Sequence, residues 1–208
     1  IYCGASSPLI KNCNIINNNA SNEAGGLFNK NGSNTQVDSC NFTANSVAAN
    51  GGGAIYNETN TNVVINNSTF TQNSTAFGRY GAAILNSTNS NTTIFKCSFV
   101  NNAAGYGGAI HNNTCSPVID SCSFVNNTAG YGGAISISGS SAMPQISGSI
   151  FSNNLASGSG GAIYSNASKP QIIGSNFNGN KAGNGGAIYS IASTASTVIR
   201  QCSFLSDI

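Results

Sequence analysis

The 208-residue chain has very few charged side chains. Lys and Arg number seven and Asp and Glu five, which is 6% of the sequence, whereas globular domains usually carry about 25% charged residues. The formal net charge is +2 and no cluster of Lys or Arg occurs, which argues against nucleic-acid binding. No apolar run approaches the roughly 18 residues that a membrane-spanning helix needs, and no signal peptide is visible.

Asparagine takes the place of the missing charges. The chain has 34 Asn, together with many Ser, Thr and Gly. Such a composition is typical of disordered segments. Here, however, Ile, Phe, Val and Ala recur at a fixed period, which disordered tracts lack, and we therefore expect a folded repeat protein.

The first recurring motif is Gly-Gly-Ala-Ile or a close variant. It is found seven times, as Gly25-Gly26-Leu27-Phe28, Gly52-Gly53-Ala54-Ile55, Gly81-Ala82-Ala83-Ile84, Gly107-Gly108-Ala109-Ile110, Gly132-Gly133-Ala134-Ile135, Gly160-Gly161-Ala162-Ile163 and Gly185-Gly186-Ala187-Ile188. The Gly pair, reduced to the single Gly81 in the third copy, indicates a tight corner where a Cβ would clash or where φ is positive.

The second motif, Phe-x-x-Asn, alternates with the first. Its phenylalanines are Phe42, Phe70, Phe99, Phe124, Phe151, Phe177 and Phe204, and its asparagines are Asn18, Asn45, Asn73, Asn102, Asn127, Asn154 and Asn180. Ile15 and Asp207 complete degenerate first and last copies. The phenylalanines lie 25 to 29 residues apart, which is the length of one coil of a solenoid.

The repeat predicts an all-β, right-handed, single-stranded parallel β-helix of about eight coils. Gly, Asn and β-branched residues disfavour a helical repeat, and no leucine pattern indicates a leucine-rich repeat. Three short strands are expected in each coil: the Gly-Gly-Ala-Ile stretch, an Ile/Val pair such as Val118-Ile119, and the stretch that ends in Phe. Ile1 and Ile208 both fall within a repeat, so residues 1–208 are expected to form one domain from a longer, uncapped solenoid.

Stacked coils turn each repeated position into a ladder. The Phe rings should stack inside, and the Asn side chains, at a turn where Asn tolerates left-handed backbone, should hydrogen-bond from coil to coil. Two residues before the Phe, an inward column holds Cys13, Cys40, Cys97, Cys122 and Cys202, with Ser elsewhere. Cys13 with Cys40, and Cys97 with Cys122, lie one coil apart at a separation that suits a disulfide, but we expect buried free thiols.

The alternating motifs resemble the repeats of the chlamydial polymorphic outer-membrane-protein family, and more widely those of pectate-lyase-like parallel β-helix proteins. The resemblance covers essentially the whole chain. The first family implies a surface adhesin, although no membrane barrel is present in these residues. The β-helix lyases and hydrolases imply clustered carboxylates, often with calcium.

No such cluster is expected here. Asp38 and Asp120 share a column but lie three coils apart, roughly 14 Å, which is too far for one metal ion or a glycosidase pair. The ion pairs Lys11–Asp38 and Lys30–Glu58 are instead expected between adjacent coils on the surface. We therefore predict no cofactor, no metal site and no enzyme activity.

The single histidine, His111, replaces Tyr in the position that follows Ile. Its neighbours in the column are Leu85 and Ser136, which offer no acid to orient it, so a catalytic role is not expected. The partly filled Tyr column is either a sugar-stacking strip or ordinary strand packing, and we favour packing.

Together these features predict a non-catalytic extracellular or cell-surface rod, such as an adhesin or filament segment. Its partners would be other copies, flanking coils, or surface and matrix ligands. The alternative is a carbohydrate-binding or polysaccharide-cleaving β-helix, with the insertion Ala76–Tyr80 as the lip of a groove. If the source is a eukaryote that exports the chain, Asn-x-Ser/Thr sequons predict glycosylation at Asn31, Asn57, Asn86, Asn112 and Asn166.

Overall fold

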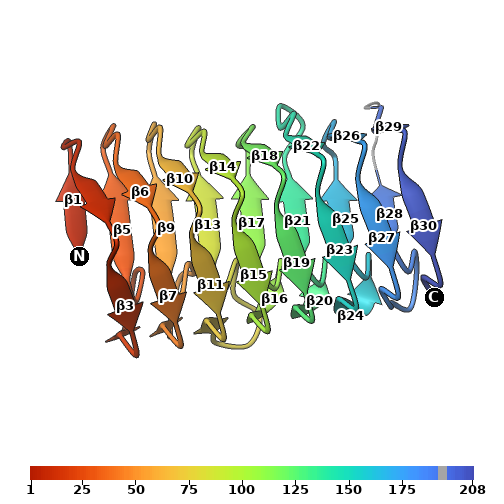
Figure 1. Cartoon of the computed structure of the whole chain (residues 1–208), viewed down its shortest axis with the longest axis horizontal. Helices are drawn as coiled ribbons and strands as arrows, with labels where there is room; N and C mark the ends of the chain where they lie inside the picture. Colours follow the sequence, from red (N-terminus) through yellow and green to blue (C-terminus); the bar gives the residue numbers. More distant parts are fainter. Residues whose placement is uncertain (192–195) are drawn as a thin grey trace.

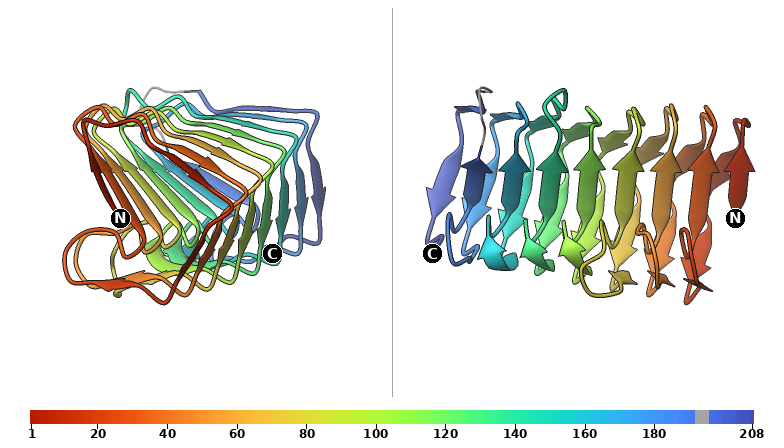
Figure 2. Two further views of the ribbon diagram at one scale, coloured as in Figure 1. Left: turned by 60° about the vertical axis from the view of Figure 1, so that its left-hand side comes forward. Right: turned by 180° about the vertical axis from the view of Figure 1, so that it is seen from behind.

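The computed structural model describes residues 1–191 and 196–208, and within them every regular element is a β-strand. The coils lie side by side from the N-terminus to the C-terminus (Figure 1). Seen obliquely along the axis, they overlie one another as a solenoid (Figure 2). Equivalent strands of successive coils pair in parallel, as the repeat predicts.

Three sheets of eight strands run the length of the rod, with one strand from each coil. The first sheet contains β1 (Tyr2–Gly4), β5 (Leu27–Lys30), β9 (Ile55–Glu58), β13 (Ile84–Ser87), β17 (Ile110–Asn113), β21 (Ile135–Ser138), β25 (Ile163–Asn166) and β28 (Ile188–Ile191). The second contains β2 (Leu9–Lys11), β6 (Gln36–Asp38), β10 (Val64–Asn66), β14 (Thr93–Phe95), β18 (Val118–Asp120), β22 (Gln145–Ser147), β26 (Gln171–Ile173) and β29 (Val198–Arg200). The third contains β3 (Asn14–Ile16), β7 (Asn41–Thr43), β11 (Thr69–Thr71), β15 (Ser98–Val100), β19 (Ser123–Val125), β23 (Ile150–Ser152), β27 (Asn176–Asn178) and β30 (Ser203–Leu205).

The three predicted strands per coil are confirmed, and a fourth sheet adds one more strand to six of the coils. Its six strands are β4 (Asn19–Ala20), β8 (Ser46–Val47), β12 (Ser74–Thr75), β16 (Ala103–Tyr106), β20 (Thr128–Tyr131) and β24 (Leu155–Ser159). They follow the asparagine turn directly. The sequence did not reveal them because several have only two residues and no apolar pattern recurs among them.

The phenylalanine ladder is confirmed. Phe70, Phe99 and Phe124 pair in register in the third sheet, and adjacent ring centroids lie 4.8 Å apart with planes within 7°. This distance equals the spacing of hydrogen-bonded strands, so each ring packs directly on the next. The inner rings have no exposed surface. Each contributes roughly 1.5–3 kcal/mol by burial, with more from ring contact.

The asparagine ladder is also confirmed. Asn102 Nδ2 donates to Asn127 Oδ1 at 3.0 Å, and the same bond repeats from Asn18 to Asn180, which donates to Asp207 at 2.8 Å. The expected left-handed backbone, however, is not at these asparagines. It lies one residue earlier, as at Asn101 with φ 56° and Asn126 with φ 55°, so the ladder residue itself keeps φ negative.

The glycine corners behave as expected from the motif. Gly107 has φ 62°, and a Cβ at Gly108 would lie 2.1 Å from the carbonyl oxygen of Gly133 in the next coil. The first copy of the motif differs from the prediction by one residue of register. Leu27, not Phe28, pairs with Ile55 and points inward.

Candidate functional site

The outer face of the first sheet carries a column of mostly large side chains. Residues alternate between the two faces of a strand, so the Ile of each Gly-Gly-Ala-Ile motif points inward and the next residue points outward. The strand register places eight residues in this outer column: Tyr2, Phe28, Tyr56, Leu85, His111, Ser136, Tyr164 and Tyr189. Ser136 is its one small member.

A row of tyrosines faces this column from the end of the fourth sheet. Tyr80, Tyr106 and Tyr131 each precede the glycine that turns the chain into the first sheet, and they pair with one another from coil to coil. Their rings follow one another at 5.3 and 5.2 Å between centroids. We call Tyr80, Tyr106 and Tyr131 the tyrosine row.

A groove of about 560 Å³ lies between the outer column and the tyrosine row. Its walls include Tyr56, His111, Ser136 and Tyr164 from the column, all three members of the tyrosine row, and Asn50, Arg79 and Asn113. Arg79 and Tyr80 belong to the insertion Ala76–Tyr80, which confirms that the insertion contributes to a groove. The groove contains no carboxylate among its lining residues.

His111 lies at the floor of this groove. Its side chain is 4% exposed, and its ring centroid lies 4.8 Å from that of Tyr80 and 6.3 Å from that of Tyr106. Nδ1 is shielded from solvent and has no hydrogen-bond partner. Burial lowers the pKa of His111 to about 3, so the imidazole is neutral at physiological pH. Such a histidine is a hydrogen-bonding group rather than a charge.

The aromatic rings do not form the flat sugar-stacking strip considered from the sequence. Phe28 and Tyr56 stack on each other at 5.1 Å, and Tyr164 and Tyr189 at 5.8 Å, so ring faces are largely covered by other rings. Five tyrosines line the groove, and each carries a phenolic hydroxyl group. Hydroxyl groups can both donate and accept hydrogen bonds, which suits a ligand rich in hydroxyls.

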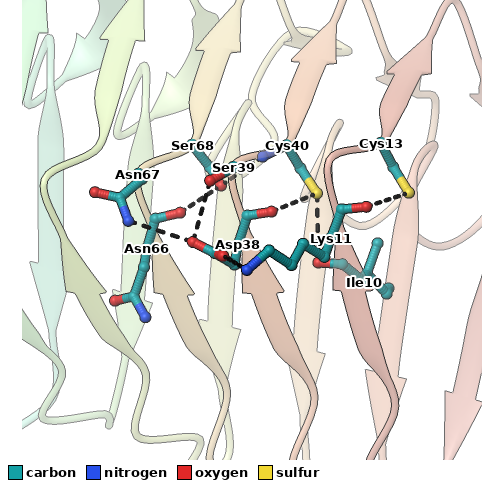
Figure 3. A network of polar contacts seen from close by, with 9 residues as sticks. All are labelled: Ile10, Lys11, Cys13, Asp38, Ser39, Cys40, Asn66, Asn67 and Ser68. Carbon is teal, nitrogen blue, oxygen red and sulfur yellow. Dashed lines mark hydrogen bonds and ion pairs between the residues drawn. The ribbon is translucent and has the colours of Figure 1, made fainter.

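Two ion pairs predicted between adjacent coils are confirmed. Lys11 Nζ lies 2.9 Å from Asp38 Oδ2, and Lys30 Nζ lies 2.8 Å from Glu58 Oε2. Figure 3 shows Asp38 also accepting hydrogen bonds from Ser39 and from Asn67 of the next coil. The hydrogen bond from Lys11 lowers the pKa of Asp38. Both oxygen atoms of this carboxylate make contacts with neighbouring surface side chains.

The inward column of cysteines is confirmed for Cys40, Cys97 and Cys122, which are at most 2% exposed. Cys13 is exposed and Cys202 is intermediate, because they belong to the first and last coils. All seven cysteines are free thiols in the structure. The hydrogen bond with Cys122, together with burial, raises the pKa of Cys97, so this thiol is unreactive. Figure 3 shows the Cys40 thiol donating to backbone carbonyl groups in the interior.

Three of the expected glycosylation sites are wrong. Asn57, Asn86 and Asn112 are fully buried and, with Asn29, form a second asparagine ladder with bonds of 2.8–2.9 Å between side chains. A glycan at these positions would have to occupy the interior of the coil. Asn31 and Asn166 are exposed and stay predictions.

The described residues hold no group of three or more His, Cys, Asp or Glu side chains that could bind a metal ion. Asp38 and Asp120 lie on β6 and β18, separated by the two intervening strands β10 and β14. Within the described part of the chain, no helix is long and apolar enough to cross a membrane.

His111 and the outer column are recognisable from the sequence, whereas the tyrosine row was not predicted. A signal for it was present: Tyr-Gly occurs at 80–81, 106–107 and 131–132, each time at the start of a glycine corner. Without the fourth sheet, nothing indicated that these tyrosines face the first sheet.

Comparison with known proteins agrees with this architecture. No curated protein and no solved structure matches the chain. The family model described as "Right handed beta helix region" matches residues 38–204, which is most of the chain. The parallel sheets, the coil-to-coil ladders and this match together show that the chain belongs to the right-handed β-helix family.

Proposed function

We propose that the protein is a non-catalytic, extracellular or cell-surface β-helix that binds glycans through its tyrosine-lined groove. The observation that carries the proposal is the groove itself, in which tyrosine, asparagine and serine side chains surround about 560 Å³. Sites for small polar ligands combine apolar walls with a few placed hydrogen-bonding groups, and this groove has both.

The absence of an acid pair in the groove favours binding over cleavage. Glycoside hydrolases use two carboxylates, one on each side of the scissile bond. The lining residues include none, and Arg79 is the one cation among them. The neutral, buried His111 has no acidic partner to make it a general base.

The rest of the molecule suits a rigid scaffold for this groove. Phe and Asn ladders join every coil to the next, which fixes the spacing of the groove walls. The resemblance to chlamydial outer-membrane-protein repeats points to a surface adhesin, and a surface poor in charge is compatible with exposure outside the cell. Flanking coils, other copies of the chain and matrix ligands are the proposed partners.

A glycan array probed with the labelled chain tests the binding proposal. We expect binding to one or more polysaccharides, and loss of that binding in Tyr80→Ala. Phe77→Ala is the matched control, because Phe77 lies on the same insertion but is fully exposed and lines no part of the groove. Failure of the chain to bind any glycan, or equal binding by both variants, would refute the proposal.

The non-catalytic role is tested with the same ligands. Incubation of the chain with each bound polysaccharide should release no reducing or unsaturated ends. Release of such ends, abolished in His111→Leu, would show that the protein is an enzyme. Surface location is tested by labelling intact producing cells with a membrane-impermeant amine reagent, which should reach the exposed Lys11.

A further inference from the structure

Four Asn-Gly pairs occur in the chain, at residues 31–32, 50–51, 178–179 and 184–185. Such pairs can deamidate without an enzyme, because glycine has no Cβ to hinder attack by its backbone nitrogen on the side-chain amide of the preceding residue. All four asparagines are exposed. Exposure therefore does not distinguish the four pairs, whereas the hydrogen bonding of the glycine N–H does.

In two of the pairs the glycine N–H is held by the next coil. Gly32 N–H donates to the carbonyl group of Thr59 at 3.0 Å, and Gly179 N–H donates to that of Leu205 at 2.9 Å. A nitrogen in such a bond keeps its proton and its position until the backbone opens locally. Attack by either nitrogen is therefore expected only after local opening.

The N–H of Gly51 is not held in this way. Gly51 lies outside the strands, and within the described residues its N–H donates to no backbone carbonyl group. The peptide groups on either side are anchored to other coils, since Asn50 N–H donates to Asn22 at 3.0 Å and Gly52 N–H donates to Tyr80 at 3.1 Å. The attacking nitrogen is thus free while its neighbours are fixed.

The fourth pair differs from the second in its place along the rod. Gly185 N–H also donates to no backbone carbonyl group of the described residues, but this glycine belongs to the last coil. Its inner equivalents, Gly107 and Gly132, donate to the following coil at 2.9 and 3.0 Å. Among the four glycines, Gly51 is therefore the one that is unpaired inside the rod, as far as the structure describes it.

The structure also keeps this reactive pair in place and in contact with water. A Cβ at Gly51 would lie 2.2 Å from the carbonyl oxygen of Tyr80, so no larger residue fits there. Asn50 is exposed and lines the groove, which gives water access to its side-chain amide.

We propose that Asn50 is a site of spontaneous deamidation, which places a carboxylate in the groove. The Gly51 nitrogen loses its proton and bonds to Cγ of Asn50, and Nδ2 takes up a proton and leaves as ammonia. Water then adds to one of the two carbonyl carbons of the resulting succinimide and opens the ring, so that residue 50 becomes aspartate or isoaspartate. Water is the one co-reactant.

The product changes the electrostatics of the groove. Asn50 Nδ2 donates to Glu23 Oε2 at 3.2 Å, and deamidation replaces this hydrogen bond by two like charges that repel each other. The new carboxylate also joins a set of lining residues in which Arg79 is the one charged side chain. This consequence holds whether or not the groove binds glycans.

The test compares rates within one sample of the folded chain. After incubation in mildly alkaline buffer, peptide mapping by mass spectrometry and enzymatic methylation of isoaspartate follow each asparagine. Asn31 and Asn178 are matched internal controls, because both are exposed and precede glycine. We expect Asn50 to convert about tenfold faster than either, which corresponds to an opening cost of about 1.4 kcal/mol at the controls. Asn50→Gln should stop conversion at this position, since its longer side chain closes a five-membered ring no longer.

Incubation of the chain in urea separates the effect of structure from that of sequence. There the ladder hydrogen bonds are lost, and Asn31, Asn50 and Asn178 should convert at similar rates. Equal rates at Asn31 and Asn50 in the folded chain would overturn the proposal. An intact Asn50 in the folded chain, or an equally large lead of Asn50 in urea, would overturn it as well.

Discussion

Replacing Asn102 by alanine is the sharpest test of the asparagine ladder. Its side chain makes four hydrogen bonds: Oδ1 accepts from the backbone N–H and from Nδ2 of Asn73, and Nδ2 donates to the carbonyl of Phe70 and to Asn127. All are 2.9–3.0 Å long and buried. At a net contribution of about 1 kcal/mol each, Asn102→Ala should lower the free energy of unfolding by about 4 kcal/mol.

Urea unfolding followed by far-ultraviolet circular dichroism measures this change. Asn178→Ala is the control, because Asn178 lies on the exposed face of β27 and the same substitution there should change stability by no more than about 0.5 kcal/mol. Asn102→Asp should destabilise the fold at neutral pH at least as much as alanine, since it buries a carboxylate against the oxygens of Phe70 and Asn127. A loss in Asn102→Ala within 0.5 kcal/mol of the control would mean that the ladder does not hold the coils together.

Three further predictions concern the interior and the groove. Phe99→Ala should lower the free energy of unfolding by about 3–5 kcal/mol, because it opens a cavity in a ladder with no exposed surface, whereas Phe77→Ala on the exposed insertion should have no effect; equal losses in urea titrations would contradict the ladder. Because burial lowers the pKa of His111 to about 3, well below its value in the unfolded chain, the unfolded state binds the proton first. The free energy of unfolding should therefore fall as pH drops from about 6.5 towards 3, by up to about 1.4 kcal/mol per unit, and His111→Leu should remove that component; identical pH profiles would refute the burial of a neutral imidazole. Finally, Cys13 should react with an aromatic disulfide reagent far faster than Cys97, which burial and its neighbouring thiol protect, and mass spectrometry that finds Cys97 labelled first would contradict this arrangement.

The ladders were predictable from sequence because they depend on repetition alone. Once Phe70, Phe99 and Phe124 are recognised as equivalent, the spacing of parallel strands places their rings in contact, with no further information needed. The two surface ion pairs followed in the same way from the register of Lys11 with Asp38 and of Lys30 with Glu58.

The groove was less predictable because it depends on how the fourth-sheet side of one coil faces the first sheet of the next. The winding of the chain brings Tyr80 onto His111 of the following coil, 31 residues later, and no repeat spacing encodes that contact. The buried ladder of Asn57 and Asn86 was missed for a related reason. These residues fit a glycosylation motif, and the sequence did not show that their side chains point inward beside Thr92, which bonds to Asn86.

The asparagine ladders also give the rod a chemical direction. In both ladders Nδ2 donates to the Oδ1 of the following coil, and along the longer one the last acceptor is Asp207, which has nothing to donate. Each inner coil of the longer ladder thus receives a hydrogen bond from the coil before it and donates an identical one to the coil after it. Adding or removing an inner coil of that ladder therefore leaves none of its asparagine side chains without a partner, so the ladder itself sets no fixed number of turns.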